Sequence, residues 1–395
     1  MLFCFIIMKK SLIALAFGTL GLGIAEFVMM AILPYVATDL HVSIPTAGHL
    51  ISAYALGVCA GAPILTLARK LPLKNILLGL VALMMIGNVC AALSPNYWSM
   101  MGARFISGLP HGAYFGVASI VAEKLADKGK GSEAVSIMIA GMTIANLFGV
   151  PLGTSLSTLL SWRLTFLLVG VWGILVLYYI WKWVPQVAGL PDNGFKGQFR
   201  FMKTTAPWLI LGATMFGNGG VFCWYSYINP LLTKVSGFSA ESITFLMVLA
   251  GFGMVVGNLI GGRLSDKYTP GRVAASTQLI ICLALLSIFF AARINWLTAL
   301  LMCICTTGLF AVSSPLQISI IHFAKGGELL GAACIQVAFN LGNAIGAFIG
   351  GLPLQEGLGY QYPALLGAPI TLIGFILTII FYKKYERKAV RTLQS

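Results

Sequence analysis

Charged residues are scarce in this sequence. They make up 9% of its 395 residues, whereas hydrophobic residues make up 58% and the mean hydropathy is +0.92. A soluble domain usually carries about 25% charged residues. A chain of this length therefore lacks the polar side chains that a water-exposed surface needs, and most of its surface is expected to face lipid.

Acids are rarer still, with eleven Asp and Glu against 25 Lys and Arg, which gives a net charge of +14. This excess of bases does not indicate nucleic-acid binding, because the bases form no patch that is interleaved with aromatic residues. The distribution of the bases along a membrane protein explains them better, as the topology below shows.

Motifs for catalysis and for cofactors are also missing. The eight cysteines all fall in apolar runs and are expected to be small packing residues. Cys303 and Cys305 have no second pair of ligands, so no metal site is expected. Because no Walker-type loop, H-E-x-x-H or nucleophile elbow occurs, the sequence predicts neither ATP-driven transport nor an enzyme, and no cofactor.

Apolar runs of about 20 residues, the length that crosses a bilayer, recur along the whole chain. The sequence predicts twelve membrane-spanning helices. They lie near residues 12–36, 46–68, 74–93, 97–121, 134–159, 163–184, 207–231, 240–264, 272–291, 296–321, 328–352 and 360–382. The start of the chain is similar to a signal peptide, but without an A-x-A site the run reads as an uncleaved first span.

The bases orient these spans. With the N-terminus in the cytoplasm, 21 of the 25 bases fall in cytoplasmic segments. Three fall outside, namely Arg163, Lys234 and Arg293, and Arg104 lies within a span. Lys and Arg in short loops set orientation, so this asymmetry predicts a multi-pass protein with both termini in the cytoplasm.

One long polar loop, residues 185–206, divides the spans into six and six. The predicted organisation is a bundle over 1–185, a cytoplasmic linker over 186–206, and a second bundle over 207–395 with a short basic cytoplasmic tail. The halves also repeat. "NLFGVPLG" (146–153) and "NAIGAFIG" (343–350) each carry Asn, then Gly three and seven residues later. Such repeats are typical of alternating-access transporters, although this spacing by itself also suits close helix packing.

Three motifs resemble those of the major facilitator superfamily. "GGRLSDKYTPGR" (261–272) is similar to its loop motif, and "RFISGLPHG" (104–112) to its fourth-span arginine motif. "GMTIANLFGVPLG" (141–153) resembles the fifth-span motif of its drug:proton antiporters. The residues that match the first and third motifs are Asp266, Lys267, Arg272, Gly149, Pro151 and Gly153. The corresponding first-half loop, 61–74, departs from the pattern because it lacks the acid.

This resemblance implies an all-α integral membrane protein with two pseudo-symmetric six-helix bundles around a central cavity. It also implies a bacterial inner-membrane antiporter that exports a sugar, sugar derivative or amphipathic drug. Asp266, Lys267 and Arg272 would form the cytoplasmic gate. The expected partners are a small-molecule substrate, protons and the lipid bilayer, with no nucleic acid, and the chain is expected to be monomeric.

Glu26 has no charged neighbour between Lys10 and Asp39. At 1.5 Å per residue it lies about 22 Å from the cytoplasmic end of its span. In a hydrocarbon core of about 30 Å this is roughly 8 Å from the outer face. Arg104 and His49 each lie about 10 Å from that face. We expect these three groups, at a similar depth, to form the proton-coupling site, because a charge in hydrocarbon needs a cavity and a partner. Two alternatives stay open: a static Glu26–Arg104 pair, and His49 as a packing residue. His111 is interpreted equally well as a hydrogen-bond donor at a helix bend.

The seventh span contains the polar and aromatic stretch "GNGGVFCWYSYINP" (217–230), and Gly and Pro within a span are typical of broken helices at binding sites. Amides beside aromatic faces suit sugars or flat amphipathic drugs. The predicted substrate-binding residues are Asn146, Asn218, Trp224, Tyr225, Asn340 and Asn343. The alternatives are that the aromatic residues form an interfacial belt and that the amides bridge helices.

The leading prediction is therefore a proton-coupled exporter that works by alternating access. The first alternative is an uncoupled facilitator or an importer with the same fold. The second is a membrane-embedded enzyme that acts on lipid-linked sugars, which would need a further intramembrane acid or a metal cluster beside Glu26.

Overall fold

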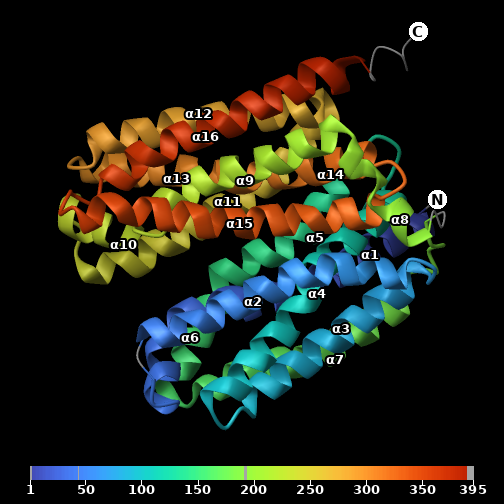
Figure 1. The fold of residues 1–395 in the computed structure, drawn as a ribbon, viewed down its shortest axis with the longest axis horizontal. Coiled ribbons are helices and arrows are strands. Elements are labelled where there is room, and N and C mark those ends of the chain that lie inside the picture. The colour runs from blue at the N-terminus through green and yellow to red at the C-terminus, as the bar shows by residue number, and fades with distance from the viewer. Residues whose placement is uncertain (1, 43, 191–193, 389–395) are drawn as a thin grey trace. The chain divides into compact units, whose positions relative to one another are not determined.

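The computed structural model describes residues 2–42, 44–190 and 194–388, and within these every regular element is a helix (Figure 1). Twelve of the helical segments are long and apolar enough to cross a membrane. The all-α fold with twelve spans is therefore confirmed. The predicted basic tail beyond residue 388 and positions 191–193 of the predicted linker lie outside the described residues.

The chain separates into two compact units. The first comprises Met1–Phe201 with Ala324–Val337, and the second comprises Met202–Phe323 with Ala338–Ser395. The helices of the first unit are α1 (Leu2–Asp39), α2 (Ile44–Leu65), η1 (Thr66–Ala68), α3 (Leu73–Ala92), α4 (Tyr97–Leu125), α5 (Gly131–Ile144), η2 (Ala145–Gly149), α6 (Val150–Leu159), α7 (Trp162–Trp183) and α8 (Gly194–Gln198). Within this unit α2 lies along α4, α3 along α7, and α1 along α5 (Figure 1).

The second unit repeats this kind of packing, with α16 against α9 and α12, and α11 against α13 (Figure 1). Its helices are α9 (Thr205–Tyr225), α10 (Ile228–Pro230), η4 (Leu231–Val235), α11 (Ala240–Tyr268), α12 (Pro270–Ala291), α13 (Asn295–Ala311), α14 (Ser313–Phe323), α15 (Glu328–Gln355, which begins among residues of the first unit), α16 (Tyr362–Phe381) and η5 (Tyr382–Glu386). A short turn, η3 (Arg200–Lys203), joins the two units along the chain.

Three spans are less regular than the sequence predicts. The fifth is α5 and α6 joined by the π-helical turn η2, and the tenth is α13 and α14 joined at Val312. The seventh was predicted to run to residue 231, but α9 ends at Tyr225. After Ser226 the Tyr227 N–H donates to the Trp224 carbonyl at 3.0 Å, and Pro230 has no N–H to continue the helix, so the chain turns into α10 and η4.

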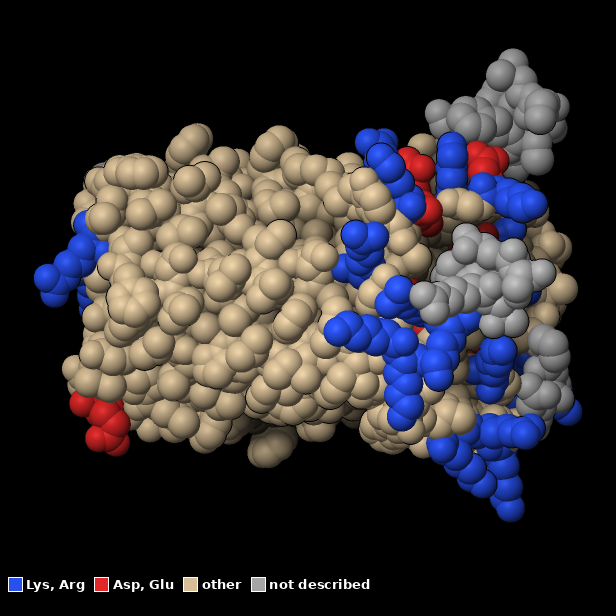
Figure 2. All heavy atoms as spheres, turned by 90° about the horizontal axis from the view of Figure 1, so that it is seen from above, with Lys and Arg blue, Asp and Glu red and all other residues tan. Residues whose placement is uncertain are grey.

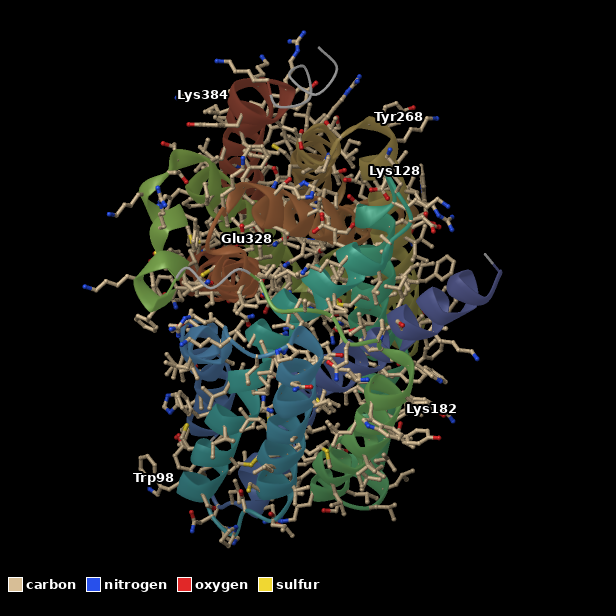
Figure 3. The ribbon with its side chains drawn as sticks, turned by 90° about the vertical axis from the view of Figure 1, so that its right-hand side faces the viewer. Trp98, Lys128, Lys182, Tyr268, Glu328 and Lys384 are labelled. Atoms are coloured by element: carbon tan, nitrogen blue, oxygen red, sulfur yellow. The ribbon has the colours of Figure 1, made fainter. Side chains whose placement is uncertain are left out.

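The surface carries the signs of a lipid environment. On the face shown in Figure 2, most of the Lys and Arg side chains gather towards the right, a few charged side chains lie at the left edge, and the broad area between them carries no charge. Large apolar side chains are exposed along the helices, among them Phe290, Phe348 and Leu159. Trp98, in the first turn of α4, points away from the helices, as an interfacial anchor does (Figure 3).

Candidate functional site

Glu26 lies on α1 in the interior of the first unit, with 5% of its surface exposed. The side chains of Ala25, Val28 and Met29 around it on the helix are buried and apolar. Its carboxylate oxygen Oε2 has no hydrogen-bond partner in the described part of the chain, and lies 3.6 Å from Nε2 of His111 on α4. A buried carboxyl group thus faces a buried imidazole across two helices.

Arg104, on α4, is fully buried but forms no ion pair with Glu26. Its guanidinium donates to two backbone carbonyls, at 2.8 Å from Ala25 on α1 and 3.4 Å from Leu50 on α2. It also stacks 4.4 Å above the ring of Tyr54, a favourable contact for a desolvated cation. Arg104 therefore ties three helices together, and its positive charge reaches Glu26 as a nearby field rather than as a direct contact.

His111 and Tyr54 complete this cluster. The Tyr54 hydroxyl lies 2.8 Å from Nδ1 of His111, and the imidazole stacks on Phe115 with ring centroids 5.1 Å apart. The sequence did not identify either residue as part of the site. The available signal was spacing: His111 follows Arg104 by seven residues, which places both on one face of a helix.

Glycines set the distance between α2 and α4. A Cβ atom at Gly57 would collide with the carbonyl oxygen of Phe105, one at Gly61 with that of Leu109, and one at Gly108 with that of Tyr54. The two backbones can approach this closely only because those side chains are absent. This approach presents the Tyr54 hydroxyl to His111.

His49 lies apart from the cluster. It is exposed, and its Nδ1 contacts the hydroxyl of Tyr97 at 3.3 Å. It forms no hydrogen bond or ion pair with Glu26 or Arg104, both of which the structure describes. A similar depth along the helices therefore does not bring these three groups into contact.

The glycine–proline motif lies where α1 packs against the fifth span. Gly149 of this motif ends the π-helical turn η2, and Pro151 follows within α6. A Cβ at Gly149 would meet Ile24 at 2.5 Å and one at Gly153 would meet Val28 at 2.5 Å, so both glycines make room for α1 on either side of Glu26. Asn146, within η2, is partly buried and donates to the Met142 carbonyl at 3.1 Å.

The other predicted substrate residues lie in the second unit. Asn218, Trp224 and Tyr225 are on α9, and Asn340 and Asn343 are on α15. Trp224 is buried, and its indole N–H has no acceptor among the residues described; Oδ1 of Asn343 likewise has no donor there. These are polar groups that a ligand could satisfy.

Glycines again hold these two helices close together. A Cβ at Gly346 would collide with the carbonyl oxygen of Gly219, and one at Gly350 with that of Cys223. The Tyr227 hydroxyl donates to the Ala347 carbonyl at 2.8 Å, which gives this residue a structural partner. The predicted amides and aromatic residues of the second unit are thus carried on one helix pair, while Asn146 is carried on the first unit.

The predicted gate residues surround the turn between α11 and α12. Lys267 and Arg272 both lie over the Tyr268 ring, at 5.2 and 5.7 Å, while Asp266 is the acid before this turn. A second acid, Glu386 in η5, accepts from the Gly271 backbone N–H with both oxygens, at 3.0 and 2.9 Å, and so caps α12. This role of Glu386 was not predicted from the sequence.

Comparison with known proteins places the chain among transporters. Residues 15–333 match the profile of the Major Facilitator Superfamily. The chain is 50% identical to AraJ of Escherichia coli (strain K12) over 96% of its own length and 97% of that protein. It is 27% identical to a protein of Helicobacter pylori (strain J99) named "Probable sugar efflux transporter", over 94% of this chain and 95% of that one. The crystal structure of the E. coli fucose:proton symporter FucP superposes with a TM-score of 0.73 at 17% identity, covering 94% of this chain and 98% of the other.

Proposed function

This chain belongs to the major facilitator superfamily, and we propose that it is a proton-coupled antiporter that exports a sugar, a sugar derivative or an amphipathic drug by alternating access. The name of the H. pylori relative supports sugar as a substrate class. The observation that carries proton coupling is the buried Glu26 carboxyl, which lies in a membrane-spanning helix without a direct cationic Arg or Lys partner.

The physics of this position favours a carboxyl group that gains and loses a proton. A charge in hydrocarbon costs about 2.5–3.5 kcal/mol on insertion scales, so the neutral acid is stable when the site is closed. Water at an open site favours the carboxylate, and so does the field of Arg104. Alternate opening to the two sides of the membrane would therefore load the proton at one side and release it at the other.

We assign the remaining residues accordingly. Arg104 sets the proton affinity of Glu26 through its field, and His49 stays a candidate for a peripheral role in proton access. The proposed substrate contacts are Asn146, Asn218, Trp224, Tyr225, Asn340 and Asn343. Asp266, Lys267 and Arg272 are proposed to form the cytoplasmic gate, and Gly149, Pro151 and Gly153 the flexible segment against α1. We place the protein in the bacterial inner membrane, as a monomer.

Glu26→Gln tests the coupling. Everted membrane vesicles are acidified inside by respiration, and substrate-dependent proton efflux is followed with a pH-sensitive dye for a panel of pentoses, hexoses and an amphipathic cation. The unmodified protein should dissipate the gradient with at least one substrate. Glu26→Gln should abolish this response, because glutamine holds no exchangeable charge.

Asp127→Asn is the matched control, because it removes an exposed carboxylate that pairs with Lys130 in a loop. It should behave as the unmodified protein does. If neither a protonophore nor Glu26→Gln changes the substrate flux, the protein is an uncoupled facilitator. Uptake driven by inward proton flow in right-side-out vesicles would identify an importer.

A further inference from the structure

Two buried polar atoms face each other in the first unit without a hydrogen-bond partner among the described residues. They are Oε2 of Glu26 and Nε2 of His111, which lie 3.6 Å apart. An orphaned polar atom in a protein interior is rare, and two that face each other are close to the distance at which a proton can pass between them. This juxtaposition needs an explanation that a packing role does not give.

The other nitrogen of the imidazole is already engaged. Nδ1 lies 2.8 Å from the Tyr54 hydroxyl, which can donate or accept. When Tyr54 donates to Nδ1, a neutral His111 carries its proton on Nε2 and points it at the Glu26 carboxylate. When Nδ1 carries the proton and donates to Tyr54, Nε2 is bare and can accept from the Glu26 carboxylic acid. The tautomer of His111 is thereby linked to the protonation of Glu26.

The surroundings limit the charges that act on this pair. The titratable and charged groups facing His111 are Glu26 from α1, Tyr54 from α2 and Arg104 from its own helix. Phe115, on which the imidazole stacks, and Phe166, 5.5 Å from the Arg104 guanidinium, supply apolar walls. Two guanidinium nitrogens of Arg104 donate to backbone carbonyls, and its Nη2 has no partner among the described residues. Because a guanidinium has no lone pair to take up a proton, His111 is the one nitrogen base that the described residues position against Glu26.

We propose that His111 relays the coupling proton to and from Glu26, and that Tyr54 selects its tautomer. In the loading step one proton binds Nδ1, the proton on Nε2 passes to the Glu26 carboxylate, and the Tyr54 hydroxyl turns from donor to acceptor. The net change is one proton gained, and His111 is neutral before and after. Release reverses these transfers. This proposal rests on the proposed proton coupling at Glu26.

Two amide variants separate hydrogen bonding from relay. His111→Gln places an amide near the position of Nε2, so it can still bond Glu26. His111→Asn places one near Nδ1, so it can bond Tyr54 but not reach Glu26. Neither amide can take up a proton and pass it on near neutral pH.

The measurements are proton uptake after a pH jump in the purified protein and substrate exchange at equal concentrations on both sides of proteoliposomes. Both variants should slow proton uptake by about tenfold or more, while exchange reports whether each variant still folds and binds substrate. Asp127→Asn should leave both rates unchanged.

Unchanged proton uptake in both variants would overturn the relay. If neither variant folds, Tyr54→Phe gives the same test, because it removes the hydroxyl that selects the tautomer while leaving Glu26 and His111 in place. If the unmodified protein transports without proton coupling but the variants still slow uptake, the proposed function fails and the relay stands. If coupling is lost in Glu26→Gln and uptake is unaffected in all three variants, the relay fails and the proposed function stands.

Discussion

Arg104 shows how a buried cation can be held without a carboxylate in direct contact. Two backbone carbonyls and the face of Tyr54 take up its guanidinium, and these groups belong to three different helices. A guanidinium suits this arrangement because its donors form a rigid fork and its plane can stack. Arg104 therefore does not neutralise the charge of Glu26 by contact, as the proposed proton exchange at that carboxyl group requires.

Asp39 offers a separate test at the C-terminal end of α1, away from the proposed proton site. Its carboxylate accepts from the Arg163 guanidinium and, at 3.2 Å, from the indole of Trp162, while Arg163 also donates to the Ser94 carbonyl at 2.9 Å. The hydrogen bond and charge of Arg163 lower the pKa of Asp39. A lowered pKa contributes stability above the unfolded-state value of about 3.9, and that contribution is lost as the pH falls through the folded value.

Asp39→Asn should therefore lower the free energy of unfolding at pH 7 by up to about 1 kcal/mol, since the pair is partly exposed and screened. The difference between the variant and the unmodified protein should shrink below about pH 4. Thermal unfolding in detergent across this range measures it. Asp127→Asn, whose partner Lys130 is 3.9 Å away, should have a smaller effect at every pH. A difference for Asp39→Asn that does not vary with pH would contradict the assigned pKa shift.

Glu26 could be predicted from the sequence because it is the one acid in a long apolar run. His111 and Tyr54 could not, because the sequence gives the depth of a residue along its helix but not the direction in which it faces across the bundle. His49 illustrates the same limit, because it was predicted to belong to the site from its depth alone. It has a similar depth to Arg104, yet its contact is Tyr97 and it does not touch Glu26. The contact between Glu26 and His111 depends on how closely α1, α2 and α4 pack.

At the scale of elements, the glycine–proline motif controls how α1 seats against the fifth span. The π-helical turn η2 precedes Pro151, which cannot donate a backbone hydrogen bond, and π-turns inside helices are frequent at functional sites. The glycines on this face contact Ile24 and Val28, which flank Glu26 on α1. Movement of η2 would therefore change the packing of α1 beside Glu26, the proposed proton site.

Gly149→Val should disrupt this seat. The added side chain would overlap Ile24, and overpacking of this kind costs about 1–3 kcal/mol. Lower thermal stability in detergent and reduced proton-coupled transport are expected. Gly79→Ala on α3 is the control, since nothing lies within 4 Å of an added Cβ there.

Ile24→Ala should partly restore Gly149→Val, because it removes the atoms that the valine meets. This compensation distinguishes a steric effect from a loss of backbone freedom. If Gly149→Val is damaging and Ile24→Ala gives no recovery, the role of the glycine is conformational rather than close packing.

The motif and its spacing could be predicted from the sequence, and the Gly and Pro residues of the seventh span indicated a broken helix there. The breaks in the fifth and tenth spans, and the residue at which α9 ends, could not be predicted. Hydropathy reports the length of an apolar run and is blind to a π-turn at 145–149 or a junction at Val312. The end of α9 at Tyr225 goes with the Tyr227 N–H, which donates to the carbonyl of Trp224, and with a proline five residues after Tyr225. Such breaks are decided by individual hydrogen bonds, which composition averages away.

For the whole molecule, the number of spans was predictable because lipid imposes one length on every crossing. The predicted and observed spans agree to within a few residues at most ends. The stretch between the spans of the two units was less predictable. Leu73 donates its backbone N–H to Val187 at 3.1 Å, and two short helical turns, α8 and η3, follow in what the sequence presents as a polar loop.

Orientation in the membrane is the prediction that concerns the whole chain at once. Lys128 follows α4 and Lys182 lies in the last turn of α7, both in segments that the base count assigns to the cytoplasm (Figure 3). With an even number of spans, both termini share one side, and the 21-to-3 distribution of bases predicts that this side is the cytoplasm. Green fluorescent protein fused after the last residue, or inserted between Gln198 and Phe199, should therefore fluoresce.

Alkaline phosphatase, which folds only outside the cytoplasm, should be active when inserted between α3 and α4, near Pro95, and inactive at the other two places. The insertion near Pro95 serves as the control that the reporter can cross with the chain. Activity at the C-terminus together with fluorescence after Gln198 would mean an odd number of spans in the second half. Alternating access by two parallel six-helix repeats requires the two halves to cross the membrane in the same orientation. That result would therefore refute both the topology and the alternating-access mechanism that depends on it.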